Sequence, residues 1–193
     1  MSVIRAFIAI ELPPDVLKNL AQVSTQLQDQ LGERVVRWVP VENIHLTLKF
    51  LGDVSVKNLD VLQELITGEA AQHKPMEFSV GGLGAFPKIR RPRVIWVGVE
   101  APGELLALQR SIEARTTHIG YPPDERPFSP HLTIGRVNRS ASPEDIRRAG
   151  DALSAMPVGF LGAVRVQAVH LFKSDLRPTG AVYSKIFTAP LAG

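Results

Sequence analysis

Two short stretches, HLTLKFLG at residues 45–52 and HLTIGRV at residues 131–137, share the pattern His-Leu-Thr-aliphatic. They lie 86 positions apart (131 minus 45), and Leu-Thr follows two of the five histidines in the 193-residue chain. One copy would indicate only an ordinary strand. Two copies indicate either an internal duplication or two His-x-Thr units that perform the same task.

The segments around each copy follow a similar order, which is strand, helix, motif strand, helix and strand. In the first half they are predicted at residues 3–10, 16–31, 44–51, 55–72 and 76–80, with a short extra strand at 35–39 and a Gly-rich turn at 81–84. In the second half they are predicted at residues 93–99, 103–118, 131–137, 143–155 and 163–172, with a final strand at 181–187. This repetition predicts an α+β fold with two similar lobes, in which helices cover sheets within one domain spanning residues 1–193.

The composition excludes several classes of protein. Hydrophobic residues make up 45% of the chain and charged residues 21%, which is typical of a globular protein, and no apolar run reaches 18 residues. There is no cysteine, so disulfides and thiolate metal sites are excluded. The opening stretch MSVIRAFIAIELPPD resembles a strand and not an export signal, and we therefore expect a cytoplasmic protein without a membrane span.

The charge distribution is mild but uneven. A net charge of +3 permits binding to nucleic acid without arguing for it. In KIRRPR, residues 88–93, four of six residues are basic. This segment is either a solvated loop ahead of a strand or a rim that contacts phosphates.

The motifs themselves indicate acid–base chemistry. Residues i and i+2 of a strand share a face, so His45 projects with Thr47, and His131 projects with Thr133. Two imidazoles facing one cleft can hold opposite protonation states near neutral pH, one accepting a proton from a nucleophile and the other donating one to a leaving group. With hydroxyls as donors to anionic oxygens, this set suits a displacement at phosphorus without a metal.

Three other interpretations remain open at this point. Both pairs are ordinary strand residues of a duplicated fold, or they form a metal site, although no third ligand stands at a telling spacing. The third interpretation is a binding module that uses the same residues without catalysis. Two intact pairs favour catalysis, because binding alone needs no acid–base pair.

The chain resembles the 2H phosphoesterases, and within them the RNA 2′,3′-cyclic phosphodiesterase branch, also called 2′–5′ RNA ligases. The resemblance covers nearly the whole chain and rests on five stretches: RAFIAIELP at 5–13, NIHLTLKFLGDV at 43–54, FPKIRRPRVIWVGV at 86–99, RPFSPHLTIGRV at 126–137 and VHLFKSDLRPTGAVY at 169–183. It implies two pseudo-symmetric lobes, each a mostly antiparallel sheet covered by helices, around a central cleft with both His-x-Thr-x motifs.

The resemblance also implies a reaction, which is hydrolysis of an RNA 2′,3′-cyclic phosphate end, or of a cyclic nucleotide, to a 2′-phosphomonoester without a metal or other cofactor. It implies that His45 is the proton donor and His131 the acceptor, with Thr47 and Thr133 holding phosphate oxygens. The alternative activity is the joining of RNA halves through a 2′–5′ bond. The other alternative is a non-catalytic module of the same fold that binds RNA ends or nucleotides. We expect the protein to act as a monomer.

Three further residues are candidates for substrate binding. The resemblance suggests that Arg136 contacts phosphate, although strict alternation along the strand would put it on the face opposite His131. Phe7 and Phe50 are candidates for stacking on a base, with plain core packing as the alternative for both.

Overall fold

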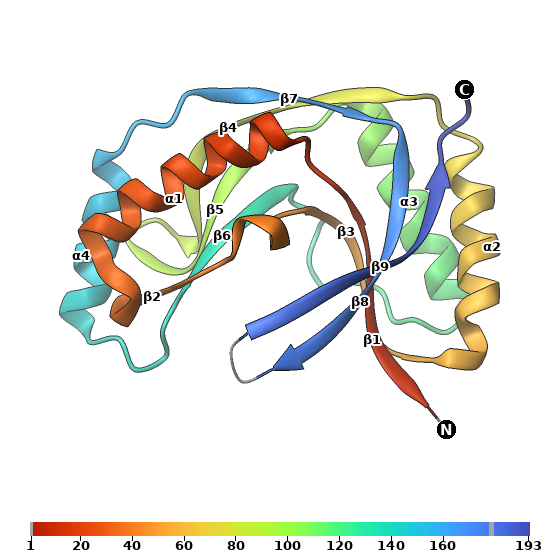
Figure 1. Cartoon of the computed structure of the whole chain (residues 1–193), viewed down its shortest axis with the longest axis horizontal. Coiled ribbons are helices and arrows are strands. Elements are labelled where there is room, and N and C mark those ends of the chain that lie inside the picture. Colours follow the sequence, from red (N-terminus) through yellow and green to blue (C-terminus); the bar gives the residue numbers. More distant parts are fainter. Residues whose placement is uncertain (1, 178–179) are drawn as a thin grey trace.

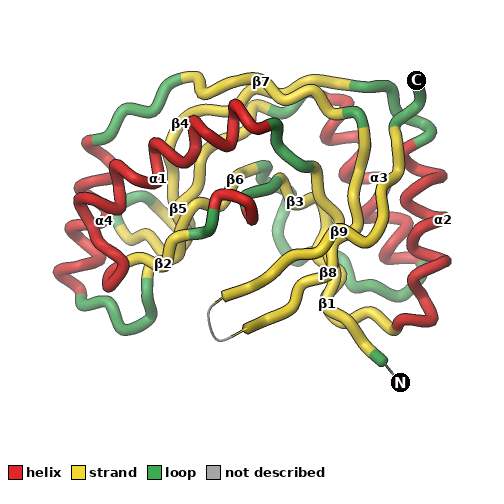
Figure 2. Tube along the Cα trace, in the orientation of Figure 1, coloured by secondary structure: helices red, strands yellow, loops and turns green. Residues whose placement is uncertain are grey.

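The computed structural model describes residues 2–177 and 180–193, which fold into two lobes that are each built on one antiparallel sheet (Figures 1 and 2). The sheet of the first lobe has the strand order β3-β1-β8-β9. Its strands are β1 (Val3–Ile10), β3 (Leu46–Ser55), β8 (Ala168–Arg177) and β9 (Gly180–Pro190). The first lobe therefore contains the first motif and the last two strands of the chain.

The sheet of the second lobe has the order β2-β6-β5-β4-β7. Its strands are β2 (Val36–Trp38), β4 (Met76–Lys88), β5 (Arg91–Glu100), β6 (His131–Val137) and β7 (Phe160–Val166). The second motif occupies β6, which lies between the edge strand β2 and the strand β5. The α+β architecture with two sheets, as predicted from the sequence, is confirmed.

Two helices cover the outer face of each sheet, as Figure 1 shows. Helices α2 (Leu59–Ala70) and α3 (Gly103–His118) pack on the first lobe, and α1 (Pro14–Val35) and α4 (Pro143–Ala155) pack on the second. None of the helices in the described part of the chain has the length and apolar character needed to cross a bilayer.

Helices α1 and α3 each follow a strand of one lobe and pack on the other, which ties the lobes together. Helix α1 follows β1 of the first lobe but packs on the second, where the Asn19 side chain donates to the Leu161 carbonyl at 2.7 Å. Helix α3 follows β5 of the second lobe but packs on the first, where the Gln109 side chain donates to the Leu48 carbonyl at 3.3 Å. A cluster of buried apolar side chains runs through both lobes.

Local sequence signals explain where several elements begin and end. Ser142 and Asp145 form a reciprocal capping box at the start of α4, with Pro143 as the first helical residue. The predicted stop at Gly32 coincides with a break in α1, because Gly32 has φ of 70° and ψ of 171°; after this kink the helix resumes and ends at Val35. Two single 3₁₀ turns, Val41–Asn43 and Val56–Asn58, precede β3 and α2.

Two sequence predictions about strands were wrong. Residues 163–172 were predicted as one strand, but the chain leaves β7 at Val166 and enters β8 at Ala168, so that the two parts belong to different sheets. The glycines at 81–84 were predicted as a turn, but they lie within β4. A Cβ at Gly84 would lie 2.2 Å from the Trp96 ring, so glycine is needed there for close packing and not for a turn.

Candidate active site

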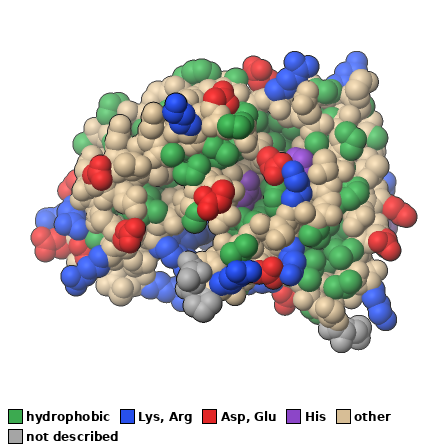
Figure 3. Space-filling view, viewed as in Figure 1, with side chains coloured by type: hydrophobic (Ala, Val, Ile, Leu, Met, Phe, Trp, Pro, Cys, Tyr) green, Lys and Arg blue, Asp and Glu red, His purple; other side chains and the backbone are tan. Residues whose placement is uncertain are grey.

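Both motifs line one pocket of about 720 Å³ between the lobes. His45 and Thr47 reach it from the start of β3, and His131 and Thr133 reach it from β6. The space-filling view shows histidine atoms recessed near the middle of the face (Figure 3). The structure therefore brings the four motif side chains to a common space, although they come from separate sheets.

The two imidazoles are held in the same way. Nδ1 of His45 lies 2.7 Å from the Asn43 carbonyl oxygen, and Nδ1 of His131 lies 2.6 Å from the Ser129 carbonyl oxygen. A carbonyl only accepts hydrogen bonds, so Nδ1 carries the proton in both rings. Nε2 of each neutral ring is left as the acceptor, which is the arrangement a general base needs before it takes a proton.

Different aromatic side chains surround the two imidazoles. The His45 ring stacks on Phe7 at a centroid distance of 4.6 Å and meets Tyr183 edge-on at 5.3 Å. The His131 ring meets Phe86 edge-on at 4.9 Å. One ring is therefore packed face to face in an apolar stack and the other touches apolar groups mainly at an edge.

This packing changes the proton affinities of both rings. Burial lowers the pKa of His45 to about 4, against the smaller raising effect of the hydrogen bond to Asn43. Burial also lowers the pKa of His131, while its hydrogen bond to Ser129 raises it and the Arg136 guanidinium lowers it further. In the free protein both rings are therefore neutral at pH 7.

A β-bulge follows the Thr of each motif and changes which side chains reach the pocket. In β6, Trp96 pairs with Thr133 and Ile95 pairs with Gly135, so Ile134 is the extra residue. The bulge reverses the alternation, and Arg136 lines the pocket with His131. The expectation that alternation turns Arg136 away failed because a strict period of two does not continue through a bulge.

The first motif has the equivalent bulge. In β3, Ala9 pairs with Thr47 and Ile8 pairs with Lys49, which leaves Leu48 as the extra residue. The next side chain on the pocket face is Phe50, which lines the pocket and is 60% exposed. Phe50 thus occupies the position in the first lobe that Arg136 occupies in the second.

The structure separates the two phenylalanines that the sequence suggested. The Phe50 ring is open to the pocket, whereas Phe7 is only 3% exposed and lies behind the imidazole of His45. Phe7 also stacks on Phe172 at 5.3 Å. The position of Phe7 therefore suits it to hold His45 rather than to contact a base.

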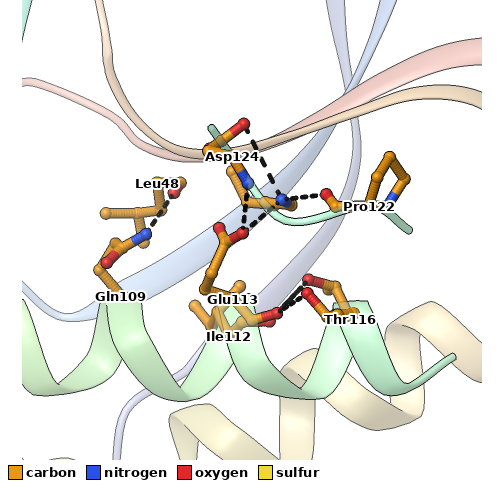
Figure 4. Close-up of polar contacts among 9 residues, drawn as sticks. Leu48, Gln109, Ile112, Glu113, Thr116, Pro122 and Asp124 are labelled. Carbon is orange, nitrogen blue, oxygen red and sulfur yellow. Dashed lines mark hydrogen bonds and ion pairs between the residues drawn. The ribbon is translucent and has the colours of Figure 1, made fainter. Parts of the chain in front are cut away.

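A buried lysine holds the loop that precedes the second motif. Lys49 Nζ lies 2.7 Å from Glu113 Oε1 and 2.7 Å from the Pro122 carbonyl oxygen, and its side chain is 0% exposed. The backbone N–H of Asp124 donates to the same Glu113 oxygen at 2.8 Å. Figure 4 shows Glu113, Pro122 and Asp124 converging at this point. The ion pair thus fixes the start of residues 122–130, the loop that ends at His131.

That loop contributes a wall of the pocket. Its residues Arg126 and Phe128 line the pocket, and its Ser129 carbonyl orients His131. Sequence analysis did not identify Lys49, Tyr183 or Phe86, since the contacts that matter join positions far apart in the chain. For the loop residues, the sequence did carry one signal, which is that residues 122–130 directly precede the second motif.

Among residues 2–177 and 180–193, no group of three His, Asp or Glu side chains is arranged to hold a metal ion. The ionisable side chains that line the pocket are the two imidazoles, the cations Lys49, Arg126 and Arg136, the carboxylates Asp124 and Glu125, and the phenol of Tyr183. Lys49 is paired with Glu113 at 2.7 Å and with Asp124 at 3.9 Å. The pocket therefore offers two imidazoles as proton carriers, with Arg126 and Arg136 as cations for an anionic ligand.

Comparison with known proteins agrees with this geometry. The sequence profile of the 2'-5' RNA ligase superfamily matches residues 12–177. The chain is 33% identical over 181 residues to the RNA 2',3'-cyclic phosphodiesterase of Methanothermobacter thermautotrophicus, covering 94% of this chain and 95% of that protein. It is 32% identical over 182 residues to the protein of the same name from Archaeoglobus fulgidus, covering 94% of this chain and 97% of the other.

Solved structures show the same fold. TT0787 of Thermus thermophilus superposes with a TM-score of 0.81 at 28% identity, covering 98% of both chains. Escherichia coli LigT complexed with 3'-AMP superposes with a TM-score of 0.77 at 22% identity, covering 100% of both chains.

Proposed function

Because this chain belongs to the 2'-5' RNA ligase superfamily, we propose that it is a 2H phosphoesterase that hydrolyses RNA 2′,3′-cyclic phosphate ends to 2′-phosphomonoesters, acting as a single bilobal domain. The observation that carries this proposal is the pair of imidazoles, His45 and His131, which line one pocket with Nδ1 of each bonded to a carbonyl. Each ring therefore has Nε2 available for proton transfer.

The reaction needs one proton accepted and one donated. Water attacks phosphorus and gives its proton to Nε2 of His131, a new P–O bond forms, and the P–O3′ bond breaks. The leaving O3′ takes a proton from Nε2 of His45, which leaves a 2′-phosphate and a 3′-hydroxyl. Thr47, Thr133 and Arg136 donate hydrogen bonds to the phosphate oxygens, where negative charge develops.

The assignment of His45 as the acid follows the family resemblance, and it requires that His45 be able to gain a proton in the site. His45 must be protonated when the P–O3′ bond breaks, yet burial lowers its pKa to about 4 in the free protein. A bound phosphate anion raises the pKa of a neighbouring imidazole. We therefore propose that substrate binding and protonation of His45 occur together.

Phe50 and Arg136 each lie two residues after a bulge, and they differ in chemistry. Phe50 presents a ring and Arg136 a cation from equivalent points of the two lobes. We propose that the terminal base stacks on Phe50 and that Arg136 holds the phosphate. If a 5′-hydroxyl replaced water as the nucleophile, the same step would form a 2′–5′ bond, which is the alternative activity.

The test is single-turnover hydrolysis of cytidine 2′,3′-cyclic phosphate in EDTA. His45→Ala and His131→Ala are each expected to lower the rate about 10² to 10⁴-fold. The double variant is expected to lose far less than the product of the two, because the residues act as a unit. His118→Ala removes an exposed histidine at the end of α3 and serves as the matched control.

Three outcomes would contradict the proposal. A folded His131→Ala protein with wild-type activity would end the two-histidine mechanism. Loss of wild-type activity in EDTA, restored by a divalent ion, would replace it with a metal-dependent one. Binding of the cyclic phosphate without any turnover would support the non-catalytic module instead.

A further inference from the structure

Two arginines face each other across the edge of the second sheet. Arg37 of β2 pairs directly with Arg136 of β6. The flanking bonds, from Val39 N–H to the Ile134 carbonyl and from Asn138 N–H to the Val35 carbonyl, make this a hydrogen-bonded pair. The Cα atoms of such a pair lie about 5.5 Å apart, with both side chains on one face of the sheet.

This pairing is unfavourable for the protein alone. Like charges directly opposite each other in an antiparallel sheet are destabilising. Both arginines are exposed, and no carboxylate within the described residues lies within 4.0 Å of either guanidinium. An anion bound between them would remove the repulsion, so the pair has the chemistry of an anion site.

The location places this anion site at the mouth of the pocket. Arg136 lines the pocket and lies close enough to His131 to lower its pKa. Val39, the residue after β2, also lines the pocket, and its N–H continues the ladder to the Ile134 carbonyl, so that its side chain lies on the same side as that of Arg37. Strand β2 is the outer strand of its sheet. Arg37 lines a smaller hollow next to this pocket, with Glu33 and Asn138. It therefore lies beside Arg136 at the edge of the sheet, outward from the pocket.

We propose that Arg37, together with Arg136, binds the phosphodiester that joins the last two nucleotides of an RNA chain whose cyclic end lies in the pocket. This inference rests on the proposed function, and it defines the substrate as a polynucleotide and not a lone cyclic nucleotide. A guanidinium has five N–H donors, so Arg136 can contact the reacting phosphate and share the next one with Arg37.

The basic hairpin KIRRPR is a less suitable position for that phosphate. A Cβ on Gly150 of α4 would lie 2.9 Å from the Ile89 carbonyl oxygen and 3.0 Å from Arg90 Cα. The hairpin therefore packs against α4, which covers the sheet face opposite the pocket. Arg90 and Arg91 provide a comparison for Arg37, because each change removes the same charge.

The experiment compares kcat/KM for cytidine 2′,3′-cyclic phosphate with kcat/KM for an oligoribonucleotide ending in the same cyclic cytidine. In Arg37→Gln the ratio of oligonucleotide to mononucleotide is expected to fall about 10-fold, as for one lost charge-assisted hydrogen bond. Arg37→Lys is expected to recover part of the ratio. Arg110→Gln, on the exposed side of α3, is expected to leave both values unchanged.

A second measurement separates this inference from the proposed function. Anisotropy titrations with an oligoribonucleotide ending in a 2′-phosphate need no turnover, and the slope of log K against log salt is expected to fall by about 0.7 in Arg37→Gln. If the wild type hydrolyses neither substrate but this slope still falls, the phosphate site stands and the proposed reaction fails.

Other results would overturn the phosphate site. An unchanged ratio and slope in Arg37→Gln would do so, as would the same losses appearing only in an Arg90→Gln, Arg91→Gln double variant. A lowered unfolding midpoint in Arg37→Gln without RNA would also count against it, since removal of the repulsion is expected to leave the midpoint equal or higher.

Discussion

Replacing Lys49 by methionine is expected to destabilise the protein strongly. Methionine is similar to lysine in length but carries no charge. The change leaves the Glu113 carboxylate without the cation at 2.7 Å and the Pro122 carbonyl without its donor. Breaking a buried ion pair by removing one partner costs more than the pair itself contributes, because the remaining charge stays in a poorly solvated place.

The magnitude follows from the burial of the two partners. Losing one partner of a buried pair costs about 3–5 kcal/mol. The Lys49 side chain is 0% exposed but that of Glu113 is 21% exposed, and Glu113 keeps its bond from the Asp124 N–H. This partial access to water puts the expected cost near the lower limit, about 3 kcal/mol. For a chain of this size that is a fall of about 6–12 °C in the unfolding midpoint.

The assay is thermal and urea unfolding followed by circular dichroism. Lys173→Met is the matched control, because it removes the same charge from a half-exposed pair with Asp175 at 2.9 Å and is expected to cost under about 1 kcal/mol. Adding Glu113→Gln to Lys49→Met removes the stranded charge, so the double variant is expected to be more stable than the sum of the single changes predicts.

One result would refute the reasoning about this pair. If Lys49→Met shifted the unfolding midpoint no more than Lys173→Met, the buried ion pair would contribute no more to stability than the half-exposed pair. The loop from Pro122 would then owe its position to other contacts.

Three other predictions follow from the site. Burial lowers the pKa of His45 to about 4, whereas a histidine of the unfolded chain titrates near 6.5, so the unfolded state binds a proton first as pH falls. The free energy of unfolding is therefore expected to drop by about 3 kcal/mol between pH 7 and pH 4 in urea titrations, and His45→Leu is expected to remove this drop. The bell-shaped pH profile of kcat/KM is expected to be centred below pH 6.5, because the pKa of His131 is lowered as well. The pH profile of kcat is expected to be centred higher, because bound phosphate stabilises the imidazolium. If the two profiles coincided, substrate binding would not be coupled to protonation of His45. Phe50→Leu is expected to lower kcat/KM about 10-fold with little change in stability, unlike the similarly exposed control Phe160→Leu on β7, which should change neither.

Sequence patterns were sufficient for most of the fold. The strand at β1, the helix at α3 and the motif strand at β6 were predicted within a residue of their bounds, because each has a clear period and a clear end. The alternation of apolar and polar residues did not reveal that the chain passes from β7 to β8, and so from one sheet to the other, at Gln167. Nothing in the local sequence distinguishes one long strand from two short ones there. The glycines of β4 were also misjudged, because their need for space comes from Trp96 on the neighbouring strand.

The site was only partly predictable, for a related reason. The motif residues could be named because a repeated pattern is visible in one dimension. The bulges at Leu48 and Ile134 are not visible in this way, since register depends on both strands of a pair. Lys49 looks like an ordinary strand lysine until Glu113, 64 positions away, is placed beside it. The contacts behind the histidines are likewise long-range.

The two motifs supply two similar histidines, whereas the proposed reaction needs two histidines that differ in proton affinity. Inequality cannot come from the motifs, which are alike down to the carbonyl two residues before each ring. It comes from the surroundings: Phe7 stacks on His45 face to face, while His131 meets Phe86 at an edge and has Arg136 nearby. Burial and charge therefore give the two rings different proton affinities. We propose that the position of a bound anion relative to Arg136 decides which ring gains the proton, so that the roles of acid and base are set outside the motifs.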